Sequence, residues 1–270
     1  MKKIKNNNII IYLLIIIIII LLLLFYLFDI KNIKVQKYLN NIHKNNIYLK
    51  SIYKNYINDK FKIIEKNNII IIEDFLNPQY FDYLKNQFNN INIKSKDYYL
   101  RKASGIDFFS LHNNNSYNGL LELYYSTEIL DFLGNVLKKP IQRPPLSDNN
   151  ASSLLIYSNE GDYIDWHKDY SIYNGDRYVM LLTLVNENST KDDISNNEFV
   201  YLYENRNYKF KMKPNSLVIF KGSEIYHKST AIKVNEKRVL YSMVFCDICQ
   251  EKKNIFHFTY EKLKNNILYI

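Results

Sequence analysis

The sequence is poor in the residues that break or cross-link a chain. Its 270 residues include 6 glycines, 5 prolines and 2 cysteines. Average usage of about 7% would give roughly 19 glycines in a chain of this length. Two cysteines exclude a small scaffold built on several disulfides, and a hydrophobic content of 47% excludes a wholly disordered chain. Asn, Ile, Lys and Tyr are abundant, and because their codons are A/T-rich we attribute this bias to the genome.

Arginine is also scarce, so the net charge of +9 depends almost entirely on lysine. Three of the lysines lie in the N-terminal tail, and no run of five basic residues occurs in the sequence. A nucleic-acid-binding surface gathers its cations on one face or along one helix. We therefore expect no nucleic-acid partner.

One long apolar segment extends from Ile9 to Phe28, 20 residues without a charge. As a helix it would span about 30 Å, the hydrocarbon thickness of a bilayer. A cleaved signal peptide has a shorter apolar core and a small-residue cleavage site, and a buried core helix would keep a polar face. The segment therefore predicts a signal anchor, a single transmembrane helix with the bilayer as its partner.

The orientation of this predicted anchor depends on a near tie in flanking charge. Three lysines lie on each side of the segment: Lys2, Lys3 and Lys5 before it, and Lys31, Lys34 and Lys37 after it. The positive-inside rule therefore discriminates weakly. The short basic tail favours a C-terminal domain on the lumenal side, in the endoplasmic reticulum or Golgi, over a cytosolic one.

The chain divides into four expected segments. Residues 1–8 are a short basic tail, 9–28 the anchor, 29–60 a helical stalk and 61–270 a folded domain. In the stalk, apolar residues recur every three to four positions, as in an amphipathic helix. The oligomeric state is left open by these patterns.

Two helices and a buried strand are predicted in the first half of the domain. Ile69–Ile72 has the unbroken apolar character of a buried strand. Asn77 can cap a helix that Pro78 opens, and Ser126 can cap a second helix over Thr127–Leu137.

From residue 152 onwards, short apolar or alternating runs follow one another, separated by polar breaks. They are Ser153–Tyr157, Tyr178–Val185, Phe199–Tyr203, Tyr208–Met212, Leu217–Phe220 and Arg238–Phe245. Many short strands at this spacing are typical of a sandwich or barrel. The absence of a glycine-rich phosphate loop argues against a nucleotide-binding α/β fold. The predicted class is mainly β with flanking helices (α+β).

The candidate chemistry starts at His167 and Asp169. Residues i and i+2 of a strand project to the same face, so both side chains can reach one metal ion. A second histidine, His227, follows Asp169 by 58 positions, and Arg238 comes 11 positions later. Two imidazoles and one carboxylate are the ligand set of non-haem Fe(II) oxygenases. A guanidinium on a neighbouring strand can bind a remote carboxylate in a bidentate fork.

The order of these residues resembles the 2-oxoglutarate/Fe(II) dioxygenase superfamily, and most closely its prolyl 4-hydroxylase-like branch. The resemblance covers residues 69–247. Its motifs are Ile71–Asn77, Arg101–Gly105, Tyr157, Gly161, Tyr163, His167-x-Asp169, the strand Arg177–Asn186, Glu198–Val200, Pro214–Phe220, His227 and Arg238.

This resemblance implies a double-stranded β-helix (jelly-roll) fold. It implies that His167, Asp169 and His227 bind iron. It further implies that Arg238 pairs with the distal carboxylate of 2-oxoglutarate, to which Tyr157 donates a hydrogen bond. The implied cofactors are Fe(II), the cosubstrate 2-oxoglutarate and O₂, with ascorbate as a candidate reductant.

The implied activity is that of a membrane-anchored hydroxylase, an oxidoreductase that converts 2-oxoglutarate and O₂ to succinate and CO₂. The leading substrates are prolyl or lysyl side chains of a protein or peptide. Arg101 and Trp166 are the candidate substrate contacts.

The chain departs from the family pattern at three points. Asn196 and Asn197 precede Glu198 where the family often has two glycines, and because Asn tolerates left-handed backbone angles the turn is expected to survive. Ser216 replaces a usual glycine, and the prolyl branch more often has lysine at the position of Arg238. These differences leave the substrate subclass open.

Three alternatives are less favoured than this hypothesis, and the first of them is kept as the alternative function. A non-catalytic jelly-roll binding module on a membrane tether would be expected to lack a metal ligand or the cation that binds the cosubstrate, whereas this chain has His167, Asp169, His227 and Arg238. A zinc or manganese site of the cupin type usually has further histidines. The nucleic-acid demethylase branch has a second arginine that residues 238–244 lack.

The cysteines and the remaining histidines are interpreted as structural or surface residues. Cys246 and Cys249 form C-x-x-C, for which a disulfide or core packing is favoured over zinc, with His257 as the one visible further ligand. His43 and His112 have no polar cluster around them in the sequence, and both are expected at the surface.

Overall fold

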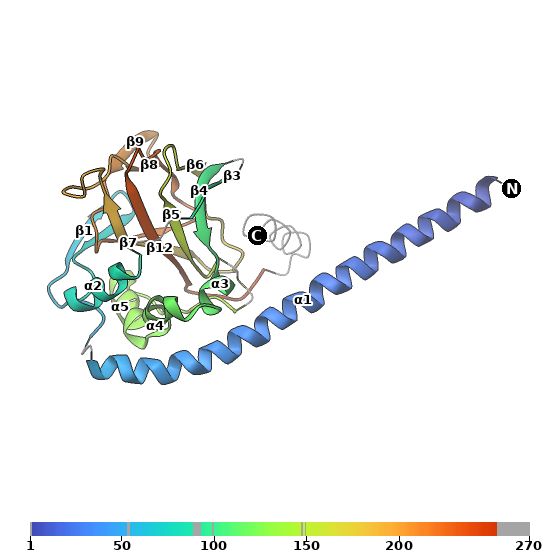
Figure 1. Cartoon of the computed structure of the whole chain (residues 1–270), viewed down its shortest axis with the longest axis horizontal. Coiled ribbons are helices and arrows are strands. Elements are labelled where there is room, and N and C mark those ends of the chain that lie inside the picture. The colour runs from blue at the N-terminus through green and yellow to red at the C-terminus, as the bar shows by residue number, and fades with distance from the viewer. Residues whose placement is uncertain are drawn as a thin grey trace.

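The computed structural model shows a strand-rich domain with a long N-terminal helix (Figure 1). It describes residues 2–52, 55–88, 93–98, 100–146, 148 and 150–252. The helices are α1 (Lys2–Ile52), α2 (Pro78–Asn86), α3 (Phe108–His112), the 3₁₀ helix η1 (Asn115–Tyr117), α4 (Asn118–Tyr125) and α5 (Thr127–Leu137). The expected class, mainly β with flanking helices, is confirmed.

The strands are short and come mostly in the second half of the chain. They are β1 (Lys62–Lys66), β2 (Ile69–Glu73), β3 (Lys96–Tyr98), β4 (Arg101–Ile106), β5 (Ser152–Tyr157), β6 (Tyr163–His167), β7 (Arg177–Glu187), β8 (Phe199–Tyr203), β9 (Arg206–Phe210), β10 (Leu217–Lys221), β11 (Tyr226–Ser229) and β12 (Lys237–Cys246).

These strands form one antiparallel sheet that is bent in two at β4. The order is β1-β2-β10-β7-β12-β5-β4-β6-β11-β8-β9, with β3 on the side of β4. Ser104–Ile106 of β4 pair with β5, whereas Arg101 and Lys102 of the same strand pair with β6. The strand therefore passes from the larger half of the sheet into the smaller half. In sheet order, the larger half is β1-β2-β10-β7-β12-β5 and the smaller half is β6-β11-β8-β9.

The central strands of the larger half, β5, β7, β10 and β12, are buried on both faces. Along β10, Leu217 and Ile219 face a core shared with α2, α4 and α5, whereas Val218 and Phe220 face a second core between the two halves. Alternate side chains point to opposite faces, so a strand covered on both sides needs an unbroken apolar sequence. This is why the predicted strands are continuous apolar runs.

The predicted helices and strands are confirmed to within a few residues. Helix α2 begins after Asn77, whose side chain accepts the Gln79 N–H at 3.1 Å. Helix α5 begins after Ser126, whose hydroxyl accepts the Ile129 N–H at 3.2 Å. The patterns did not predict β1 or the short helices α3 and α4.

Helix α1 includes both the predicted anchor and the predicted stalk. It runs as a single rod beneath the domain, and its N-terminal half extends away from the sheet (Figure 1). Val35 and Ile42 are buried in the core that α3 and α4 share. The expected division at residues 8, 28 and 60 stays a prediction.

The described part of the chain contains no helix that combines enough length with enough apolar character to cross a membrane. The predicted transmembrane helix is therefore not supported. The predicted single-pass membrane location, with a lumenal catalytic domain, is wrong on this finding.

Candidate metal centre

The three predicted metal ligands lie together in the structure. His167 ends β6 and is the direct cross-strand partner of His227 on β11. Asp169 follows two residues after β6, and its backbone N–H donates to the carbonyl of Gly222 at 3.0 Å. One donor atom from each of the three side chains lies within 4.8 Å of the others, which is the spacing that one ion can bridge.

A β-bulge aims His167 at this site. Ile164 pairs with Ser229 and His167 with His227, so two residues of β6 lie opposite one residue of β11. The Trp166 N–H donates to the Asp165 carboxylate at 2.8 Å within the bulge. An extra residue in one strand reverses the alternation of side chains. Ile164 and His167 therefore both face the inside of the bent sheet.

Backbone carbonyls hold both imidazoles by the same ring atom. The Nδ1 of His167 lies 2.7 Å from the Asp165 carbonyl, and the Nδ1 of His227 lies 3.1 Å from the Ile225 carbonyl. A carbonyl can only accept, so each Nδ1 carries the proton and each Nε2 keeps its lone pair for a metal. The Nε2 of His227 lies 3.7 Å from Asp169 Oδ2.

Burial favours the neutral form of His227. Its side chain stacks on Phe199 at 5.2 Å and meets Phe220 edge-on at 4.8 Å. Burial lowers its pKa to about 4, and the nearby Asp169 carboxylate opposes this shift only in part. At neutral pH the imidazole is therefore uncharged, as a metal ligand must be. Two imidazoles and one carboxylate are a ligand set that fits an Fe(II) ion.

Arg238 lies at the opposite end of the same inner surface. It is the largest fully buried side chain of the described residues, with 1% of its surface exposed. Its Nη1 donates to Asn197 Oδ1 and to Ser229 Oγ, both at 2.6 Å, and its Nη2 contacts the sulfur of Met212 at 2.8 Å. Among the described residues, no carboxylate pairs with this guanidinium.

Tyr157 lies beside Arg238. The two residues are cross-strand partners of β5 and β12, and the guanidinium carbon lies 5.3 Å from the centre of the tyrosine ring. Burial raises the pKa of Tyr157, although Arg238 and a hydrogen bond to Ser229 act in the opposite direction. The phenol therefore keeps its proton and can donate it to an anion.

The sequence did not predict the neutral partners of Arg238. Asn197 was considered only for its backbone, yet its side chain contacts the guanidinium, and neither it nor Asn196 has a left-handed backbone. Ser229 lies two positions after His227 and shares its inward face. The two-residue spacing of Ser229 from His227, which puts both side chains on one face of a strand, could have identified Ser229 from the sequence.

The two candidate substrate residues lie at the edge of the site. Trp166 stacks on Tyr226 at 5.1 Å, and the Lys228 ammonium lies 5.0 Å from the Trp166 ring. Arg101 pairs with Ile164 across β4 and β6, and its charge acts on the Tyr157 phenol. Neither position tests contact with a substrate, so both roles stay predictions.

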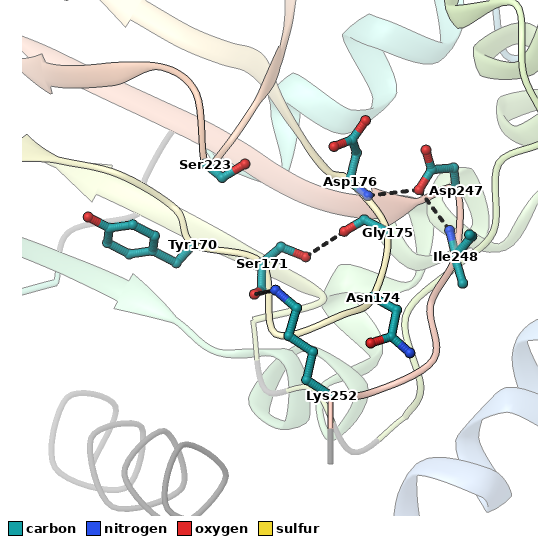
Figure 2. Close-up of a pocket in the computed structure, with 9 residues that line it drawn as sticks. All are labelled: Tyr170, Ser171, Asn174, Gly175, Asp176, Ser223, Asp247, Ile248 and Lys252. Atoms are coloured by element: carbon teal, nitrogen blue, oxygen red, sulfur yellow. Dashed lines mark hydrogen bonds between the residues drawn. The ribbon is translucent and has the colours of Figure 1, made fainter. Parts of the chain in front are cut away.

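A polar pocket of ≈ 430 Å³ is lined in part by the loop that follows the metal ligands. Its first lining residue, Tyr170, comes directly after Asp169 in the sequence. Figure 2 shows the loop from Tyr170 to Asp176 on one side and Asp247 and Ile248 on the other. The Asp247 carboxylate accepts the N–H groups of Asp176 and Ile248, each at 2.8 Å. These bonds tie the loop that leaves the metal site to the end of β12.

Two further predictions have clear outcomes. Cys246 and Cys249 form a disulfide, so neither thiolate is available for zinc, and His257 lies outside the described residues. His43 is exposed as expected, but the surface position expected for His112 is wrong. Its ring nitrogens lie 2.7 Å from the Phe108 carbonyl and 3.0 Å from the Tyr125 hydroxyl. These partners compensate for its burial at the end of α3.

Comparison with known proteins places the fold. No family model matches the chain, and no curated protein matches its sequence. A 2OG-Fe(II) oxygenase family oxidoreductase from Burkholderia pseudomallei superposes with a TM-score of 0.51 at 9% identity, over 69% of this chain and 89% of that one. The non-haem α-ketoglutarate-dependent epimerase SnoN from nogalamycin biosynthesis superposes with a TM-score of 0.51 at 10% identity, over 67% and 79%. The chain has the fold of the 2-oxoglutarate/Fe(II) oxygenases.

Proposed function

We propose that the protein is an Fe(II)/2-oxoglutarate-dependent dioxygenase that hydroxylates a protein side chain, with proline and lysine as the leading substrates. One observation carries this proposal. A buried guanidinium without a carboxylate partner among the described residues faces the same interior as a cluster of two histidines and an aspartate. An uncompensated buried charge is costly, so the arrangement is suited to binding an anion.

The spacing of His227 and Ser229 along β11 supports a dicarboxylate as the anion. His227 and Ser229 lie on one face of β11, two residues apart, and Ser229 contacts Arg238 directly. Two residues of a strand cover about 6.7 Å. A five-carbon dicarboxylate has a similar length. With one end at the metal ligands and the other at Arg238, 2-oxoglutarate fits this separation.

The ligand set determines which metal chemistry is available. Bound Fe(II) would couple the oxidative decarboxylation of 2-oxoglutarate by O₂ to hydroxylation of the substrate. His167, Asp169 and His227 would hold the ion on one face and leave the opposite face open. Backbone carbonyls prevent either imidazole from rotating.

The other residues of the inner surface bind and shield the cosubstrate. Arg238 would neutralise its distal carboxylate, and Tyr157 would donate a hydrogen bond to it. Phe199, Phe220 and Met212 line the same interior and exclude water from it. Exclusion of water strengthens each of these polar contacts.

The metal ligands lie at an accessible rim, which suits a bulky substrate. His227 is buried, whereas His167 and Asp169 are partly exposed. Trp166 and Tyr226, which precede the two histidines on their strands, stack on each other on the outer face. A side chain presented by a protein or peptide could therefore approach the ion from this rim.

The proposal is tested by succinate formation from 2-oxoglutarate and O₂ by Fe(II)-loaded protein. Replacing His167 by Ala should abolish turnover, and replacing Arg238 by Ala should raise the 2-oxoglutarate requirement at least tenfold. His43→Ala and Arg206→Ala are matched controls, since both side chains are exposed and outside the site. They should leave turnover unchanged.

The substrate is tested with peptides that contain proline or lysine, by mass spectrometry of a product heavier by one oxygen atom. Folded, iron-loaded protein that neither binds 2-oxoglutarate nor makes succinate would contradict the proposal. A non-catalytic binding module would then be the better interpretation of the fold.

A further inference from the structure

A network of buried neutral groups surrounds Arg238 and links the strands β7, β11 and β12 through residues of the neighbouring loops. Asn186 of β7 is a cross-strand partner of Arg238, and its side-chain amide donates to the Met212 carbonyl at 2.7 Å. Its Oδ1 accepts the hydroxyl of Ser195 at 2.5 Å. The same hydroxyl accepts the backbone N–H of Asn197 at 3.2 Å. The backbone N–H of Asn197 is therefore tied to Asn186 through the Ser195 hydroxyl.

The orientation of the Asn197 amide is fixed by what it contacts. Its Nδ2 donates to the carbonyl of Thr230. Its Oδ1 accepts from Arg238 Nη1 at 2.6 Å and from the Ser229 hydroxyl at 3.1 Å. A flipped amide would place a donor against the guanidinium and an acceptor against a carbonyl. Only one orientation satisfies both contacts.

These contacts leave one edge of the guanidinium available. Asn197 and Ser229 use both hydrogens of Nη1. Nη2 contacts a thioether, which is a weak acceptor, and Nε has no hydrogen-bond partner among the described residues. The Nε hydrogen and one Nη2 hydrogen lie in the plane of the guanidinium and point in the same direction, along one edge. That edge matches the two oxygens of a carboxylate.

We propose that Asn197 is a positioning residue that holds Arg238 by Nη1 and so presents the Nη2–Nε edge to the distal carboxylate of the cosubstrate. This inference rests on the proposed function and adds a residue that determines the choice of cosubstrate. An amide suits the task because it orients the cation without neutralising it. A carboxylate at this position would pair with Arg238 and remove the charge that attracts the ligand.

The experiment compares two 2-oxo acids by isothermal titration calorimetry on the full chain with Mn²⁺. 2-Oxoglutarate carries the distal carboxylate, and 2-oxopentanoate has the same chain without it. The native protein should prefer 2-oxoglutarate. Asn197→Ala should reduce this preference about tenfold, because an orienting hydrogen bond to a charged group is lost. Asn197→Asp should reduce it further, because it pairs with the cation.

Affinity for 2-oxopentanoate should stay unchanged in both variants, which a merely structural role would not predict. Asn197→Asp keeps the shape of the side chain and supplies a counter-ion, so it should fold even where Asn197→Ala does not. Asn196→Ala is the matched control. That neighbouring amide contacts Glu236 instead, at 2.7 Å, and its loss should leave the preference intact.

The outcomes separate the inference from the proposed function. If the native protein does not prefer 2-oxoglutarate over 2-oxopentanoate, the proposed function fails. If it does, and both variants keep the preference or tighten 2-oxoglutarate binding, the role of Asn197 is refuted. Equal weakening of both acids would likewise reduce Asn197 to a structural residue.

Discussion

At the scale of single residues, two buried arginines differ in what compensates their charge. Arg177 at the start of β7 lies 3.8 Å from the buried carboxylate of Asp148. Arg238 on the adjacent strand has neutral contacts among the described residues. Burial lowers its pKa, but a guanidinium keeps its proton in proteins. The unpaired cation therefore costs stability until an anion binds.

This difference predicts opposite effects for one substitution. Without ligand, Arg238→Met should stabilise the protein by about 1–4 kcal/mol, because an apolar side chain replaces an unpaired buried charge. Arg177→Met should destabilise it by about 3–5 kcal/mol, because Asp148 is then left buried without its cation. Urea unfolding measures both. A destabilising Arg238→Met would mean that the charge is compensated in the free protein.

Glu122 on α4 makes the stability depend on pH. The residue is buried, and burial raises its pKa to about 7 from an ordinary value of 4.5. The folded protein therefore binds a proton that the unfolded chain has lost above pH 4.5. Stability that is present below pH 4.5 should fall as the pH rises to 7, by on the order of 3 kcal/mol.

Glu122→Gln should remove this decline, because the amide stays neutral. It should raise the melting temperature at pH 8 and change it little at pH 4.5, which calorimetry can measure. Glu128→Gln is the contrasting control. That carboxylate accepts the N–H groups of Tyr56 and Ile57 at 3.1 and 2.8 Å, so its neutralisation should lower the melting temperature. Equal pH profiles for the native protein and Glu122→Gln would refute the assignment.

At the scale of elements, the metal centre depends on the close approach of two segments. Gly222, directly after β10, lies against Asp169, which follows β6. A Cβ added at Gly222 would lie 2.4 Å from the Asp169 carbonyl oxygen and 2.8 Å from its Cβ. Only a glycine lets the backbone carrying the ligand pass at this distance.

Gly222→Ala should therefore weaken metal binding about 10- to 100-fold without changing a ligand. Titration calorimetry with Mn²⁺ measures the affinity. Gly134→Ala in α5 is the control, since its Cβ would meet only an ordinary contact at 3.5 Å. It should stabilise the helix by about 0.5–1 kcal/mol and leave metal affinity unchanged. Unchanged metal affinity in Gly222→Ala would show that the loop moves to make room for the added methyl group, and would contradict this prediction.

At the scale of the whole molecule, the bent sheet is stabilised on one side by helices, including part of α1. Val35 and Ile42 are each 2% exposed, whereas the side chains from Ile11 to Tyr26 are 40–66% exposed. The two parts of this one helix therefore contribute differently to the stability of the domain.

Shortening the chain should separate these contributions. A protein that begins at residue 30 should keep the unfolding free energy of the full chain. One that begins at residue 55 should lose about 3 kcal/mol, because burial of Val35 and Ile42 is lost. Chemical unfolding of the three proteins provides the measurement. Equal stabilities would show that α1 does not stabilise the domain.

The sequence by itself determined most strands of the second half of the chain, two helix caps and the order of the three candidate metal ligands. Strands buried on both faces need unbroken apolar runs, and His167, Asp169 and His227 follow a recognisable order along the chain. An apolar run is a local signal, and the ligand motif depends only on the order of its residues along the chain, so both can be recognised in the sequence alone.

Only the tertiary structure decided which neutral groups surround Arg238. Asn197 contacts the guanidinium across 41 positions of sequence. His112 is buried by helix packing that the residues around it in the sequence do not predict. The bulge in β6 likewise becomes visible only when its pairing with β11 is known. Such contacts depend on the register between distant strands, which the composition and periodicity of a single segment do not specify.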